Sequence, residues 1–331
     1  MNKQERALRN ALDRFTPEMR AAFTQAIRDA AVSVDQRRLA YLIEQGRIEE
    51  AVQLLRIDQS LFAPLKDAIR GAYAQGGALA EQIAPAGLTG VFRFDGTQAA
   101  AMQWVLTRGA DLVHGITDEG IATARKVIAA GLDEGLSSSE VARSITGRKI
   151  GKQRVGGFLG LTEQQADSII AGRAKLASGD PAQMREYLQL KLRDTRYDAQ
   201  IKRAIKEGKA IKGADLDRIM EAHRSKALGY RGRVVAKHES HQALAAGRAE
   251  GMSQMLARDD VEAVTCRWQH NLSVEPRPDH VAMSGTVVEY GQAFDFPDGT
   301  QMRWPHDENA PARHTIGCRC VGIFRVKLRR Q

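Results

Sequence analysis

Apolar residues recur at three- and four-residue steps along the first part of the chain, which is the period of an amphipathic helix. The segment Thr16-Pro17-Glu18 supplies an N-cap residue, a first-turn proline and a first-turn acid, so we predict that a helix begins there. A second helix is predicted to begin near Ser60 and to end at Gly76 and Gly77. Residues 85–100 are rich in Pro and Gly and are expected to form a loop or short strand at a boundary.

Two capping-box patterns in the middle of the chain, at residues 137–140 and 162–165, each predict the start of a short helix. The stretch between them, GRKIGKQRVGGFLGLT, is rich in glycine and basic residues. We interpret it as a connecting loop, with a helix–hairpin–helix turn that offers N–H groups to phosphates as the alternative. Helical periodicity returns at residues 217–257, with an expected break at 229–232.

The pattern changes after residue 258. Short β-branched or aromatic pieces such as AVTCRW, GTVVEY and CRCVGIFRV are separated by Gly, Pro and Asp-Gly, which is typical of strands and turns. We therefore predict a mainly α protein with a small C-terminal α+β module: an elongated helical body followed by a compact strand-and-turn domain ending in Cys-Arg-Cys. The expected domains are an N-terminal helical region at 1–84, a helical body at 85–258 and the C-terminal module at 259–331.

Composition narrows the class of protein. Hydrophobic residues make up 43% and charged residues 27% of the 331 positions, which favours a globular chain over a disordered one. No apolar run approaches the roughly 18 residues of a membrane span, and the charged start MNKQERALRN lacks the apolar core of a secretory signal. Three cysteines, an odd number, do not make a secreted disulfide framework. We expect synthesis in the cytosol and no membrane span.

The net charge of +9 is clustered in acid-free runs. One run holds five cations: Arg143, Arg148, Lys149, Lys152 and Arg154. A second run, at residues 224–237, includes Arg231 and Arg233. Such fields attract phosphate backbones without reading their sequence, so these seven residues are candidate DNA or phosphate contacts. The alternative is that they form solvated helix faces.

The C-terminal segments RPDHVAMSGTVVEYGQAFDFPDG and WPHDENAPARHTIGCRC resemble the signature of the phage minor head, or head-morphogenesis, family, which includes the F protein of phage Mu. The upstream stretch VVAKHESHQALAAGRAEGM is similar to the helix of that family, although Lys237 and His238 replace its usual Arg-Thr. The matching positions are Glu239, Arg277, His280, Gly285, Pro305, Pro311, Cys318, Arg319 and Cys320.

This resemblance implies a structural role inside the capsid near the portal, in head assembly and genome packaging or delivery. The implied partners are the portal protein and the major capsid or scaffolding protein, with packaged double-stranded DNA next to the basic runs. The implied location is the host cytoplasm during assembly and then the interior of the virion. A non-sequence-specific nucleic-acid-binding protein outside a virion and a metal-dependent nuclease are the alternative functions.

Two of the three cysteines, Cys318 and Cys320, stand one position apart. Residues i and i+2 of a strand lie about 6.6 Å apart along its axis, so a disulfide between them is a poor interpretation. We expect no cofactor, with zinc as the alternative if the chain bends at this point. The candidate ligands are His280, His314, Cys318 and Cys266, with Cys320 as a substitute. Otherwise the two cysteines pack as small apolar residues of a late strand, and Arg319 faces solvent or Asp279.

The remaining histidines and acids do not form a convincing catalytic centre. The run His306-Asp307-Glu308-Asn309, with Asp279, His280 and His314, could be interpreted as a metal nuclease with a histidine base. However, scattered His and Asp residues in turns are ordinary. The chain also contains no phosphate-binding glycine motif of the P-loop or dinucleotide type. We therefore expect that the protein is not an enzyme.

Overall fold

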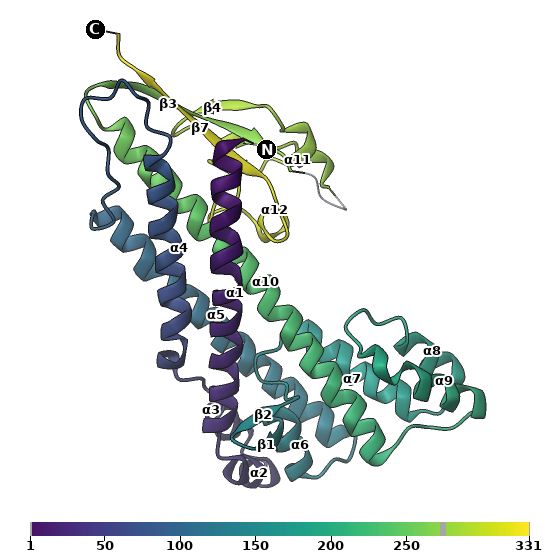
Figure 1. Ribbon diagram of the computed structural model, residues 1–331. Coiled ribbons are helices and arrows are strands. Elements are labelled where there is room, and N and C mark those ends of the chain that lie inside the picture. Colours follow the sequence, from purple (N-terminus) through teal and green to yellow (C-terminus); the bar gives the residue numbers. More distant parts are fainter. Residues whose placement is uncertain (1, 272–275, 331) are drawn as a thin grey trace. The chain divides into compact units, whose positions relative to one another are not determined.

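A computed structural model of the chain describes residues 2–271 and 276–330 (Figure 1). The fold is mainly α with a small C-terminal α+β module, as predicted. The helices are α1 (Lys3–Ser33), α2 (Gln36–Glu44), α3 (Ile48–Gln53), α4 (Ala63–Glu81), α5 (Ala99–Asp133), α6 (Ser138–Thr146), α7 (Glu163–Ala177), α8 (Pro181–Tyr187), α9 (Asp198–Glu207), α10 (Gly213–Leu256), α11 (Pro278–Ala282) and α12 (Ala312–Thr315). The strands are β1 (Arg148–Ile150), β2 (Gln153–Val155), β3 (Val261–Gln269), β4 (Val287–Glu289), β5 (Phe294–Asp295), β6 (Gln301–Met302) and β7 (Val321–Leu328).

The chain forms two compact units, each assembled from segments that are distant in sequence. Unit 1 consists of Met1–Ala21, Pro64–Ala110 and Arg233–Gln331, and unit 2 consists of Ala22–Ala63 and Asp111–Gly232. The boundaries between the units fall inside α1, α5 and α10 and after the first residue of α4. This division differs from the three consecutive domains expected from the sequence. Hydrophobic periodicity identifies helices, but it does not reveal which helices pack together.

Two helix ends and one expected helix break differ from the prediction because packing outweighs local signals. Helix α1 begins at Lys3 and continues through Pro17, and its buried residues Leu8 and Met19 lie on both sides of the proline. Helix α4 continues through Gly76, where a Cβ would lie 2.5 Å from the carbonyl oxygen of Leu244 in α10. That glycine therefore permits close contact between the two backbones and does not end the helix. Helix α10 runs unbroken for 44 residues, since an interior glycine costs a helix only about 1 kcal/mol.

Unit 2 is a helical core with a small hairpin. Both predicted capping boxes are present: the side chains of Ser137 and Thr162 accept the N–H groups of the residues three positions later, which open α6 and α7. The glycine-rich stretch between these helices is not a plain loop, because β1 and β2 pair in it as an antiparallel hairpin. A Cβ on Gly147 would lie 2.5 Å from the carbonyl oxygen of Val155, so only glycine fits at this position.

In unit 1, the C-terminal module is built on the antiparallel sheet β4-β3-β7 (Figure 1). Its buried core includes Trp268 of β3 and Phe294 of β5, whose ring centroids lie 5.2 Å apart. Helix α1 contacts the edge strand β7 through Gln4. The Gln4 amide donates to the carbonyl of Phe324 at 2.8 Å and accepts the Phe324 N–H at 3.1 Å. The side chain of Gln4 thus replaces a neighbouring strand at that point.

None of the helices in the described residues is both long and apolar enough to cross a membrane.

Candidate metal centre

Cys318 and Cys320 lie in a bend that immediately precedes β7. All three cysteines of the chain are free and buried. The N–H of Cys320 donates to the sulfur of Cys318 at 3.3 Å, so the backbone folds back between the two residues. The bend follows Gly317, whose φ of 75° is accessible to glycine at little cost. The expectation that both cysteines belong to the late strand was therefore wrong, since the strand begins at Val321.

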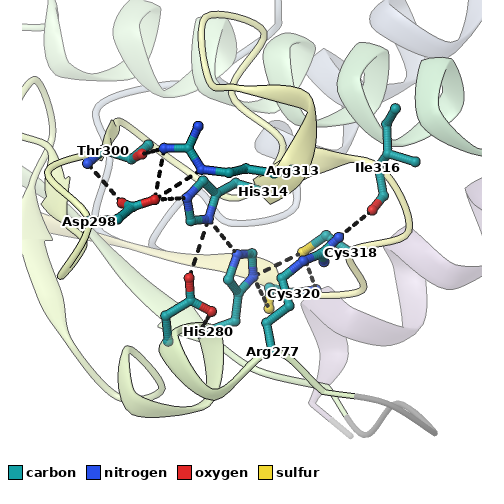
Figure 2. A network of polar contacts seen from close by, with 10 residues as sticks. Arg277, His280, Asp298, Thr300, Arg313, His314, Ile316, Cys318 and Cys320 are labelled. Carbon is teal, nitrogen blue, oxygen red and sulfur yellow. Dashed lines mark hydrogen bonds and ion pairs between the residues drawn. The ribbon is translucent and has the colours of Figure 1, made fainter.

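His280 of α11 faces both thiols, as Figure 2 shows. Its Nδ1 atom lies 3.5 Å from the sulfur of Cys318 and 3.5 Å from the sulfur of Cys320. The three ligand atoms all lie within 4.8 Å of one another, and all three side chains are buried. Tetrahedral coordination with typical zinc bond lengths separates a sulfur and a nitrogen ligand by about 3.5 Å. The protein therefore contains a cluster of donor atoms with the spacing of a metal centre.

His314 lies behind His280 and not beside the sulfur atoms. Its Nδ1 is 3.1 Å from Nε2 of His280, and its Nε2 is 2.9 Å from a carboxylate oxygen of Asp298 (Figure 2). We assign the protons so that His280 donates to His314, which in turn donates to Asp298. This assignment leaves the lone pair on Nδ1 of His280 directed at the two sulfurs. A carboxylate–histidine chain of this kind commonly orients a metal-binding imidazole.

Asp298 is held by several donors from the same part of the module. Arg313 donates two hydrogen bonds to it at 3.0 and 2.8 Å, and the N–H of Thr300 donates a third at 3.0 Å. The hydrogen bonds from His314 and Arg313 lower the pKa of Asp298 well below its ordinary value. A second carboxylate, that of Asp279, lies 3.6 Å from Nδ1 of His314. The outer side of His280 is thus a network of fixed polar groups.

His306 is a further functional candidate. It is buried, and it has a φ of 68°, a conformation that costs a non-glycine residue about 1–3 kcal/mol. Neither of its ring nitrogens has a hydrogen-bond partner in the described part of the chain, and the ring stacks on His241 at 4.4 Å. The pKa of Cys318 is lowered well below its ordinary value by the thiol of Cys320 and then by the nearby imidazoles of His306 and His280. His306 does not belong to the group of donor atoms within 4.8 Å of one another, which consists of His280, Cys318 and Cys320, so its ring would have to shift to join them.

Cys266 does not take part in this cluster. It lies in β3 opposite Val288 and Phe324, and no group of metal-ligating atoms found among the described residues includes it. Its sulfur lies 3.0 Å from where a Cβ on Gly322 would be, and burial raises the pKa of its thiol to about 12. Of the five candidate ligands, the structure brings together His280, Cys318 and Cys320, places His314 behind them and leaves Cys266 apart.

Other residues that carry the resemblance noted in the sequence support the same module. Arg277 donates to the carbonyl of Ile316 at 2.6 Å and so ties the start of α11 to the turn before the cysteines. Gly285, with a φ of 94°, donates its N–H to the carbonyl of Trp268 at 2.8 Å. Arg319 is exposed, whereas Asp279, its suggested partner, accepts the N–H of His280 and faces His314.

Glu239 of α10 forms a buried ion pair. Arg108 of α5 contacts its two carboxylate oxygens at 2.8 and 2.6 Å. Burial raises the pKa of Glu239, while Arg108 opposes that shift. The geometry is the two-point contact that a guanidinium makes with a carboxylate, so this pair joins α5 and α10 within unit 1.

The acids beside His306 are held by an arginine of the same turn. Arg303 contacts Asp307 at 2.7 Å and Glu308 at 3.1 Å, and the side chain of Asp307 is buried. Asp307 also accepts the N–H groups of Arg303 and Asn309. These carboxylates stabilise the turn around His306.

The seven candidate phosphate contacts fall into different environments. Arg148 pairs with Glu221 at 2.9 Å, Arg154 donates to Gln36 at 2.7 Å, and the buried Arg231 pairs with Glu119 at 2.6 Å. The other four residues are exposed: Arg143, Lys149, Lys152 and Arg233. Arg148 is exposed as well, so the hairpin and the end of α6 present four cations to solvent, one of which pairs with Glu221.

Comparisons of the chain with protein-family models, with curated proteins and with solved structures found no match.

Proposed function

We propose that this chain is a structural minor head protein of a tailed phage or prophage, and that zinc holds its C-terminal module closed. One observation carries the proposal. Residues of the family-like signature that are 38 and 40 positions apart, His280 with Cys318 and His280 with Cys320, meet in one buried cluster. A signature that marks one structural element is expected to converge in this way.

The chemistry of the donor atoms favours zinc. Thiolate and imidazole ligands at tetrahedral spacing are typical of zinc, whereas magnesium and manganese prefer oxygen ligands. Cys318, Cys320 and His280 would supply three ligands, and His306, which lies outside their group, would supply the fourth after a shift of its ring. Four protein ligands leave no open position for a substrate, so the ion would contribute to folding and not to catalysis. This argument also disfavours the nuclease.

The remaining features fit a capsid component. The chain carries a net charge of +9, and its exposed hairpin cations Lys149 and Lys152 could lie against packaged double-stranded DNA. Its protein partners would be the portal protein and the major capsid or scaffolding protein. It would first be present in the host cytoplasm and then inside the virion.

The test is purification of assembled heads from cells that produce the phage. We expect the protein to remain with the heads through density-gradient centrifugation, at a copy number well below that of the major capsid protein, as measured by quantitative mass spectrometry. Heads made without the gene should be defective in assembly or in DNA content. Purified heads that lack the protein, or normal infectious particles made without the gene, would overturn the proposal.

A further inference from the structure

His314 and Asp279 place two further donor atoms next to His280, on the side of its ring that faces away from the sulfurs. Nδ1 of His314 lies 3.1 Å from Nε2 of His280 and 3.6 Å from Oδ2 of Asp279. One ligand atom from each of these three residues lies within 4.8 Å of the other two. This group shares His280 with the proposed zinc centre, but that zinc ion would contact neither Asp279 nor His314.

The spacing of these atoms is close to that of metal ligands. Tetrahedral coordination with bonds to nitrogen and oxygen of about 2.0–2.2 Å separates neighbouring ligand atoms by about 3.3–3.6 Å. The two separations in the protein, 3.1 and 3.6 Å, lie at or just below this range. Small movements of the side chains would therefore admit an ion. The side chain of Asp279 is 29% exposed, which gives the ion a path from solvent.

The hydrogen bond on the far side of His314 directs a lone pair into this group. Nε2 of His314 donates to Asp298 at 2.9 Å, and Arg313 and Thr300 hold Asp298 in place. In the tautomer that we assign, Nδ1 of His314 therefore carries no proton and its lone pair points towards His280. A carboxylate that fixes an imidazole in this way is the usual support of a metal-binding histidine.

Asp279 brings a negative charge to the same point. Its Oδ1 atom accepts the N–H of His280 at 2.8 Å, which fixes the direction of the carboxylate. Its Oδ2 atom faces Nδ1 of His314, and the described residues donate no hydrogen bond to it. The single proton on Nε2 of His280 serves His314 and not Asp279. Two lone pairs thus face each other across 3.6 Å, and a cation between them would satisfy both.

We propose that Asp279, His280 and His314 bind a second divalent metal ion, and that the imidazole of His280 bridges it to the zinc ion. This inference rests on the zinc centre of the proposed function. Nδ1 of His280 would bind zinc and Nε2 the second ion, whose class accepts imidazole and carboxylate ligands, as zinc itself does. The proton on Nε2 would pass to solvent, and water would take the open positions. Because one of its three protein ligands is shared, the second ion should bind more weakly than the first and be lost during purification unless metal is added.

Titration of the metal-free full-length protein with cobalt(II) tests this proposal, because cobalt bound to thiolate has a charge-transfer absorption that cobalt bound to nitrogen and oxygen lacks. We expect two bound equivalents by equilibrium dialysis, the first with the thiolate absorption and the second without a further increase in it. One bound equivalent with that absorption would mean that only a proton lies between His280 and His314, which overturns the second site and leaves the zinc centre intact. No bound cobalt, or cobalt without the absorption, would contradict the zinc centre and this inference with it.

The variant Asp279→Asn distinguishes the two ions, because its amide oxygen can still accept the N–H of His280 while the negative charge is lost. We expect the second equivalent to bind at least about tenfold more weakly and the thiolate absorption of the first to stay unchanged. Asp259→Asn removes an exposed carboxylate elsewhere in unit 1 and should keep both equivalents. Unchanged affinity for the second equivalent in Asp279→Asn, or its loss in Asp259→Asn, would refute the assignment. If Asp279→Asn does not fold, the titration of the unaltered protein still decides the question.

Discussion

Nε2 of His280 lies 3.1 Å from Nδ1 of His314, and the two imidazole rings are nearly parallel, with 8° between their planes. The two histidines therefore have different roles, although the sequence treated both as candidate ligands. His280 faces the sulfurs of Cys318 and Cys320, whereas His314 fixes the orientation and tautomer of His280. This relationship gives the first prediction.

Replacing His314 by alanine should weaken zinc binding without abolishing it. Loss of a residue that supports a metal ligand typically costs about 10–100-fold in affinity. Competition with a zinc chelator of known affinity would measure the change. His114→Ala, a substitution at an exposed histidine in unit 2, serves as the control and should leave affinity unchanged. If His314→Ala lost zinc as completely as a cysteine variant, His314 would be a direct ligand and our assignment would be incorrect.

The variant His306→Gly tests whether His306 binds zinc or only carries backbone strain. Glycine accepts the φ of 68° at little cost, so removing strain alone should stabilise the protein by about 1 kcal/mol or more. If His306 is the fourth ligand, the variant should instead lose zinc affinity, and the stability gain should appear only in the presence of chelator. Thermal melting with and without chelator would distinguish the two. A variant that is stabilised under both conditions and keeps its zinc affinity would show that His306 is not a ligand.

The fold class and the residues of the candidate metal centre could be predicted from the sequence. How the helices pack and how those residues are arranged in space could not. Helical periodicity and the capping boxes at Ser137 and Thr162 depend on residues close in sequence, and both were confirmed. The course of α4 through Gly76 could not be predicted, because that glycine is explained by a contact with Leu244, which is far away in sequence. The same limit applies to the metal centre.

His306 illustrates this limit for the site. In the sequence, His306 stands among histidines and acids that suggested a nuclease. Only the structure shows that its neighbours Asp307 and Glu308 have another role, since they pair with Arg303. The exclusion of Cys266 likewise depends on the register of β3 against β7, which sets Cys266 opposite Phe324. Register across a sheet depends on tertiary packing and is not encoded in the spacing of cysteines.

The ion pair of Glu239 with Arg108 should be important for stability. Glu239→Ala leaves a largely buried guanidinium without its partner, and we expect a loss of about 3 kcal/mol in the free energy of unfolding. Chemical denaturation would measure it. The double variant Glu239→Met with Arg108→Met should recover much of the loss, because no unpaired charge remains. A loss below about 1 kcal/mol in the single variant would contradict this role.

His223 should make unit 2 less stable in acid. Burial lowers its pKa in the folded protein to about 4, whereas the unfolded chain has a value near 6.5. The unfolded state therefore binds the proton first, and stability should fall as the pH decreases from about 6.5 towards 4, by up to about 3 kcal/mol. We expect His223→Gln to lose less stability than the wild type over this range, measured by denaturation at each pH. His114→Gln is the exposed control, and identical pH profiles for wild type and His223→Gln would contradict the prediction.

The most direct measurement is the zinc content of the purified full-length protein, determined by mass spectrometry of the metal together with the protein concentration. We predict about one zinc ion per chain in the wild type and in Cys266→Ser, and none in the double variant Cys318→Ser with Cys320→Ser. The chelated wild type should melt at the lower temperature of that double variant. Wild-type protein without zinc after expression in zinc-containing medium, or equal loss of zinc in Cys266→Ser, would contradict a zinc centre built on His280, Cys318 and Cys320.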